Sequence, residues 1–234
     1  MHLRIKASAR FPFEDPNWPR KFLMGGATGL LLELIFVGLT QLASDEAAFL
    51  IAPLVVGLNF PALGYILQVY RAATLSGVGP LPEWENWPAL FRGGLAGFAI
   101  GLGYGMIPLL LLLWGLGLLV EGGVRLFLGM VLMVLGVLAA MFMLFFLPMG
   151  LARYLGQRRL EVAFHPGSLW DGIHPILAEY VATYLLSVGS YILGSLIAAI
   201  PYFGALAWPF LWFYLMLVQA RLFGEVCSKT ASTP

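Results

Sequence analysis

Long apolar runs alternate with polar stretches along the chain, and each run is long enough to cross a bilayer. A transmembrane helix needs about 20 predominantly apolar residues. The connections between runs are alternately long and short, which predicts helices paired as hairpins. We therefore expect an all-α integral membrane protein with six spans, at about 20–43, 47–71, 92–120, 124–153, 174–199 and 203–226.

These spans form three predicted hairpins, at about 20–71, 92–153 and 174–226, within one membrane domain of residues 20–226. An amphipathic segment, 1–19, precedes the domain, and a short tail, 227–234, follows it. Of the 13 basic residues, only Arg125 falls beside a short connection. Because cytoplasmic loops are enriched in Lys and Arg, both termini and both long connections are expected in the cytoplasm of a cell membrane.

Composition agrees with a chain that is mostly surrounded by lipid. It is 60% hydrophobic and 11% charged, whereas soluble domains are about 25% charged. The net charge of +1 indicates no nucleic-acid partner. Cys227 is the single cysteine, so no disulfide framework is expected within the chain. The first twenty residues lack an apolar core, so we expect the first span to act as its own insertion signal.

An internal repeat is indicated by two similar segments. Asn17-Trp18-Pro19 precedes a Gly-Gly pair, and Asn86-Trp87-Pro88 precedes another. A weaker version opens the third hairpin at Trp170 and His174-Pro175. Because all three copies have the same predicted orientation, this is a parallel pseudo-repeat rather than an inverted one.

Some of these motifs resemble those of a known family. The stretch from Gly64-Tyr65 to Arg71, the motif Leu81-Pro82-Glu83-Trp84 and the stretch from Phe91 to Gly94 are similar to a family of prokaryotic membrane proteins, the domain of unknown function 4013. The ending Ala220-Arg221-Leu222-Phe223-Gly224 resembles the last span of that family. The resemblance implies a bacterial or archaeal multi-span protein and supplies no activity or catalytic residue.

Two features stand out in the stretch 81–105. Glycines at four-residue spacing, Gly93, Gly97, Gly101 and Gly105, form one stripe on a helix and predict close helix packing in lipid. Trp residues mark the polar segments, and Trp favours the membrane–water boundary. These Trp/Pro segments are expected to form either a partner surface or an amphipathic collar in the headgroups, through Trp18, Trp84, Trp87 and Trp170.

Glu33 lies near the middle of the first predicted span, where an acid must face protein or water. Asn59 and Tyr104 are expected at a similar depth. Two interpretations stay open. Glu33 is part of a proton or cation site, or it is protonated and hydrogen-bonded to Asn59 as packing. A water-accessible cavity at Glu33 would favour the first, and a dry Glu33–Asn59 hydrogen bond the second.

Prolines are expected to interrupt four of the spans, with Pro148 in the fourth and Pro209 in the sixth. Pro61 has no N–H to donate and crowds the preceding turn, so the second span should kink there, and Pro108 should kink the third. A broken helix facing an acid near the midplane is how several transporters frame a site.

No catalytic constellation is apparent in the sequence. His165 and His174 flank Asp171, but their spacing favours a loop surface over a zinc site. We expect no enzyme activity, no metal and no cofactor. The favoured function is a non-catalytic accessory or scaffold subunit that binds membrane lipids, another membrane protein or a second copy of itself. The alternative is a small transporter or channel with a Glu33/Asn59 site.

Overall fold

The structure is a computed structural model, and it describes residues 5–42, 55–76, 79–120 and 122–231. Every regular element in these ranges is helical, as the long apolar runs predicted. The elements are α1 (Ile5–Arg10), η1 (Phe11–Glu14), α2 (Trp18–Leu42), α4 (Phe60–Arg71), η2 (Ala72–Ser76), α5 (Trp87–Leu119), α6 (Gly123–Gln157), η3 (Leu160–Phe164), α7 (Pro166–Ile173), η4 (His174–Ile176), α8 (Leu177–Ala198) and α9 (Phe203–Ala231).

Five helices within the described residues are long and apolar enough to cross a membrane. They are Trp18–Leu39, Trp87–Leu119, Gly123–Gln157, Pro166–Ala198 and Phe203–Thr230. The membrane character of the chain therefore agrees with the sequence analysis. The predicted span 47–71 lies partly outside the described residues, so six spans and their arrangement as a repeat stay predictions.

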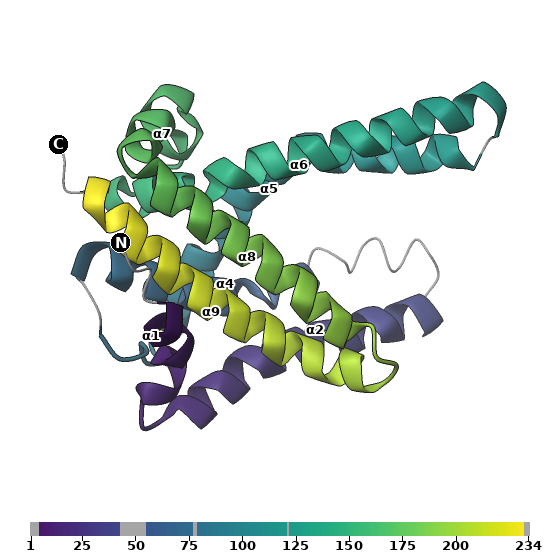
Figure 1. Ribbon diagram of the computed structural model, residues 1–234. Coiled ribbons are helices and arrows are strands. Elements are labelled where there is room, and N and C mark those ends of the chain that lie inside the picture. Colours follow the sequence, from purple (N-terminus) through teal and green to yellow (C-terminus); the bar gives the residue numbers. More distant parts are fainter. Residues whose placement is uncertain (1–4, 43–54, 77–78, 121, 232–234) are drawn as a thin grey trace. The chain divides into compact units, whose positions relative to one another are not determined.

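The structure divides into two units. One contains the residues up to Gly97 and those from Gly172 onward, and the other contains Phe98–Asp171. In the first unit, α9 packs against α2, α4 and α8, and Figure 1 shows α8 and α9 side by side. Phe213 and Leu217 of α9 are almost completely buried. The last helix is thus the centre of this unit.

Glycines allow the helices of the first unit to approach closely. A Cβ added at Gly64 would overlap the backbone of Leu90, and one added at Gly94 would overlap the backbone of Phe60. α4 therefore crosses the beginning of α5 with backbones in contact. Gly94 and Gly64 make the closest approaches, whereas the sequence analysis singled out the stripe at 93–105. In that stripe, Gly93 faces Gly64 and Gly97 faces Leu67.

The second unit is built on the hairpin of α5 and α6. The turn between them uses Gly122 and Gly123, both with positive φ, a conformation that costs glycine little. Across the hairpin, Gly115 packs against Gly129. Within this unit, a Cβ added at Gly101 or Gly105 meets no described atom within 4 Å. Pro108 lies inside α5.

Candidate functional site

Glu33 lies on the face of α2 that packs against α9. Gly25, Gly29 and Glu33 follow one another at four-residue spacing, so they share one face of the helix. A Cβ added at Gly25 would overlap the ring of Phe213, and one at Gly29 would lie 3.1 Å from Cβ of Pro209. The contact between the helices therefore runs along this stripe. Glu33, one turn further on, is half-buried rather than fully exposed.

Asn59 lies in a break of the helical backbone. Residues 55–57 are helical, Leu58 and Asn59 form a turn, and α4 then begins at Phe60. The backbone carbonyl of Asn59 accepts a hydrogen bond of 3.1 Å from the N–H of Leu63. The backbone of Asn59 is therefore part of the first turn of α4, whereas its side chain takes no part in capping that helix.

The side-chain carbonyl of Asn59 is buried and has no hydrogen-bond partner in the described part of the chain. An Asn at the N-cap usually accepts a hydrogen bond from the second or third residue of its helix. Here the second residue is Pro61, which has no N–H, and the side chain makes no capping bond. A buried acceptor left unpaired lowers the stability of a protein by about 1–3 kcal/mol. A ligand that donates a hydrogen bond to Oδ1 would remove this cost.

A pocket of about 200 Å³ joins Glu33 to Asn59. No hydrogen bond links these two side chains, both of which the structure describes. The pocket opens where α2, the turn before α4 and the start of α9 converge, and none of its described lining residues is basic. Its lining residues are Gly29, Leu32, Glu33, Asn59, Trp208, Pro209 and Trp212.

The chemistry of this pocket is that of a carboxylate and an amide oxygen between aromatic walls. Indole faces attract cations through the negative face of the ring. A carboxylate within a membrane span is stabilised by a cation or by a proton. The arrangement therefore suits a positively charged or proton-donating occupant.

Tyr104, the third residue expected at this depth, belongs to the second unit. Its hydroxyl donates a hydrogen bond to the backbone carbonyl of Ala163, and its ring stacks on Phe164 at 5.4 Å between centroids. Its side chain therefore connects α5 to η3 within that unit, whereas Glu33 and Asn59 belong to the first unit.

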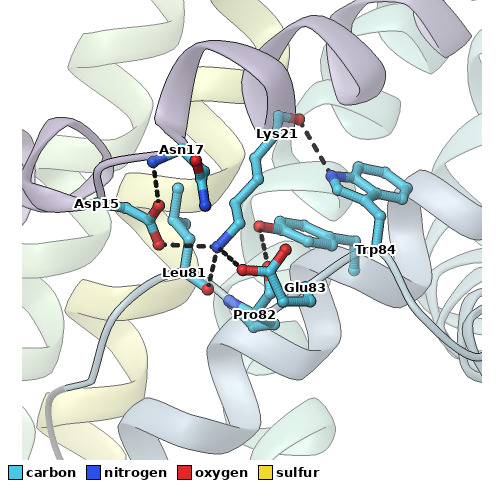
Figure 2. A network of polar contacts seen from close by, with 8 residues as sticks. Asp15, Asn17, Lys21, Leu81, Pro82, Glu83 and Trp84 are labelled. Atoms are coloured by element: carbon cyan, nitrogen blue, oxygen red, sulfur yellow. Dashed lines mark hydrogen bonds and ion pairs between the residues drawn. The ribbon is translucent and has the colours of Figure 1, made fainter.

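A second polar cluster surrounds Lys21, and the sequence analysis did not single it out (Figure 2). The ammonium of Lys21 lies 2.8 Å from Oδ2 of Asp15 and 2.6 Å from Oε1 of Glu83. It also donates to the backbone carbonyl of Leu81 at 2.8 Å. All three N–H groups of this buried side chain are thereby used. The cluster joins the N-terminal segment, α2 and the stretch that precedes α5.

Asp15 is held in its charged form by this cluster. Burial alone would raise the pKa of its carboxyl, but hydrogen bonds from Lys21 and from the backbone N–H of Asn17 outweigh it and hold that pKa below its usual value. The N–H of Asn17 lies 2.7 Å from Oδ1 of Asp15. Both carboxylate oxygens are therefore hydrogen-bonded.

Trp84 requires a correction to the predicted partner surface. Its side chain is buried, it stacks on Tyr65 at 4.3 Å between ring centroids, and its indole N–H donates to the backbone carbonyl of Lys21 at 3.1 Å. A residue whose ring and N–H are both satisfied inside the protein is not available to a partner. The motif Pro82-Glu83-Trp84 resembles a segment at the membrane–water boundary. Only the tertiary contacts of Trp84 show that its side chain is buried inside the protein.

The other three Trp residues of the predicted surface keep part of their side chains accessible. Trp87 and Trp170 are each 46% exposed. Trp18 is partly buried and lies edge-on to Phe13 at 4.9 Å between centroids. Whether these side chains meet lipid or a partner stays a prediction.

Among the residues that the structure describes, no group of three or more His, Cys, Asp or Glu side chains is placed to hold a metal ion. Glu179, a buried acid of α8, pairs instead with Lys229 of α9 at 2.6 Å. Cys227 is buried, and the hydroxyl of Tyr70 lies 3.5 Å from its sulfur. These groups hold α9 in place.

Comparison with known proteins gives a family match. The family described as DUF4013, proteins of unknown function, matches residues 47–203. This range includes Asn59, whereas Glu33, Trp208 and Trp212 lie outside it. Comparison with curated proteins and with solved structures found no match.

Proposed function

This chain belongs to the DUF4013 family of proteins of unknown function, and we propose that it is a small membrane transporter that binds a cation at the Glu33/Asn59 pocket. Its five long apolar helices support the membrane setting. The observation that carries the proposal is the buried, unpartnered carbonyl of Asn59 beside a pocket that reaches Glu33.

The pocket favours the transporter hypothesis over the accessory-subunit hypothesis, which the sequence alone had favoured. A dry hydrogen bond between Glu33 and Asn59 would have favoured the interpretation of Glu33 as packing, and with it the accessory subunit. The two side chains instead line a pocket of about 200 Å³. Within a membrane, an acid and an unpaired amide both destabilise the protein unless a partner binds them. A bound cation would satisfy both groups at once.

The broken helix supports transport for a separate reason. Interrupted membrane helices free polar groups near the bilayer centre, and transporters use them to hold ions and substrates. Here the turn at Leu58 and Asn59 replaces helix immediately before α4, whose second residue is Pro61. The interruption thus coincides with Asn59, whose amide lines the pocket.

We further propose that the pocket lies in the outer half of the bilayer of a cell membrane. The distribution of basic residues favours cytoplasmic termini and six spans, including 47–71. Glu33 is in the second half of α2, and Trp208 is near the start of α9. In this orientation, both positions are far from the cytoplasmic ends of their helices.

Uptake into liposomes tests the proposal. The purified protein is reconstituted, and uptake of Na⁺, K⁺, protons and methylammonium is measured under inward gradients. We expect uptake of at least one of these cations, and we expect Glu33→Gln to abolish it. Asp171→Asn is the matched control because it removes the charge of an exposed acid of α7, so this variant should transport normally.

Two results would contradict the proposal. One is the absence of uptake of every cation by the parent protein, and the other is uptake that survives Glu33→Gln. Native mass spectrometry from the original membrane then addresses the accessory hypothesis. A stoichiometric second polypeptide, together with absent uptake, would support an accessory subunit.

A further inference from the structure

The described side chains that line the pocket at Glu33 offer few oxygen atoms to a bare metal ion. Side chains supply two carboxylate oxygens from Glu33 and one amide oxygen from Asn59. Ca²⁺ takes 6–8 oxygen ligands and Mg²⁺ requires near-octahedral coordination, while K⁺ filters use rings of carbonyls. The remaining walls are carbon-rich: Leu32, Trp208, Pro209 and Trp212. Such walls would leave most of the coordination shell of an inorganic ion empty.

The size of the pocket also favours an organic occupant over a bare metal ion. Its volume of about 200 Å³ is far larger than the roughly 15 Å³ that a cavity needs to hold one water molecule. It is smaller than the 300–1,000 Å³ of sites for drug-sized ligands. The pocket therefore suits an organic molecule of a few heavy atoms.

The hydrogen-bonding state of Asn59 adds a requirement for an N–H donor. Its buried Oδ1 accepts no hydrogen bond from the residues that the structure describes. A quaternary ammonium has no N–H to offer, whereas a protonated primary amine has three donors. One such ammonium can donate to Asn59 and to the carboxylate of Glu33 while its alkyl chain contacts the indole rings.

Building on the proposed cation site, we propose that its occupant is a small protonated primary amine with an alkyl chain. The charge lies between Glu33 and Asn59, where a charge-assisted hydrogen bond forms. The chain lies against Trp208 and Trp212, which also attract the ammonium through their ring faces. Leu32 and Pro209 complete the apolar wall.

Isothermal titration calorimetry of the purified full-length protein tests this inference with four probes. They are n-butylammonium, tetramethylammonium, K⁺ and n-butanol. We expect n-butylammonium to bind most tightly, because only this probe combines charge, N–H donors and an alkyl chain. Glu33→Gln should weaken its binding more than ten-fold, and Asp171→Asn should leave it unchanged.

Asn59→Ala separates the donor requirement from the charge requirement. This variant should weaken n-butylammonium binding by about five-fold, the value of one net hydrogen bond. Its affinity for tetramethylammonium should not change, because that ion donates no hydrogen bond. Trp212→Leu should weaken both cations by about three- to thirty-fold.

The probe series on the parent protein keeps the inference falsifiable even if a variant fails to fold. Binding of K⁺ or tetramethylammonium as tight as that of n-butylammonium, lost in Glu33→Gln, would overturn the amine class and leave the cation site standing. Equal binding of n-butanol, or no binding of any cation, would overturn the amine inference and the proposed cation site together.

Discussion

The ammonium of Lys21 lies 2.8 Å from the carboxylate of Asp15, and both side chains are only 4% exposed. This pair fixes the N-terminal segment to the start of α2. Glu83 and the carbonyl of Leu81 share the same ammonium. One buried lysine therefore connects three stretches of chain that the hydrophobic pattern alone treats as separate.

Removal of Lys21 should destabilise the fold. In Lys21→Met, the carboxylate of Asp15 stays buried without its cation, and breaking a buried pair in this way costs on the order of 3 kcal/mol. Unfolding in mixed micelles with a rising fraction of SDS measures the change. Arg20→Met is the control, because Arg20 is exposed and adjacent. An equal loss in both variants would contradict a structural role for the cluster.

Stability should depend on the charge of Asp15. Because the pKa of this carboxyl is lower in the folded protein than its usual value, its contribution is present above the unfolded pKa of about 3.9 and is lost as pH falls through the folded pKa. We expect the parent protein to lose stability progressively below about pH 5. Midpoints of unfolding measured from pH 7 to pH 3 would reveal this.

The variant Asp15→Asn assigns that pH dependence to one residue. It should be less stable than the parent at pH 7, because Lys21 loses its buried counter-charge. The difference should shrink as acid protonates Asp15 in the parent. Glu14→Gln, at an exposed neighbouring position, should follow the parent curve. A constant difference between Asp15→Asn and the parent across this range would contradict the prediction.

Trp84 and Trp87 should respond differently to substitution. Trp84→Ala removes a ring that stacks on Tyr65 and an N–H that donates to Lys21, and it should cost about 3–5 kcal/mol. Trp87 is 46% exposed, so Trp87→Ala should cost about 1 kcal/mol or less. Thermal unfolding in detergent measures both. Similar losses would mean that Trp84 is no more a core residue than Trp87.

The positions of most helices follow from local properties of the chain. The span predicted at 203–226 corresponds to α9, and the span predicted at 124–153 corresponds to α6. A long apolar run must be helical in lipid, because only a helix satisfies its backbone groups within one segment. The turn at Gly122 and Gly123 is likewise local, since it depends on positive φ at two successive residues.

The face of α2 that carries Glu33 was also accessible from the sequence. Its four-residue spacing from Gly25 and Gly29 places it on the small-residue stripe, and small residues mark helix contacts in membranes. The sequence instead led us to predict close helix packing along the glycine stripe at 93–105. The contact between α2 and α9 shows that the shorter stripe locates the candidate site.

Three features depended on tertiary structure alone. Glu33 and Asn59 share a pocket with Trp208 and Trp212 because α2, α4 and α9 converge. Lys21 lies among Asp15, Leu81 and Glu83, although the sequence indicates only a basic residue at a span end. Trp84 is buried and Trp87 is half-exposed. The sequence determined the helices and their membrane character, because hydrophobicity and backbone satisfaction act locally. Only the tertiary structure decided the pocket and the lysine cluster, because contacts between distant residues depend on how helix faces pack.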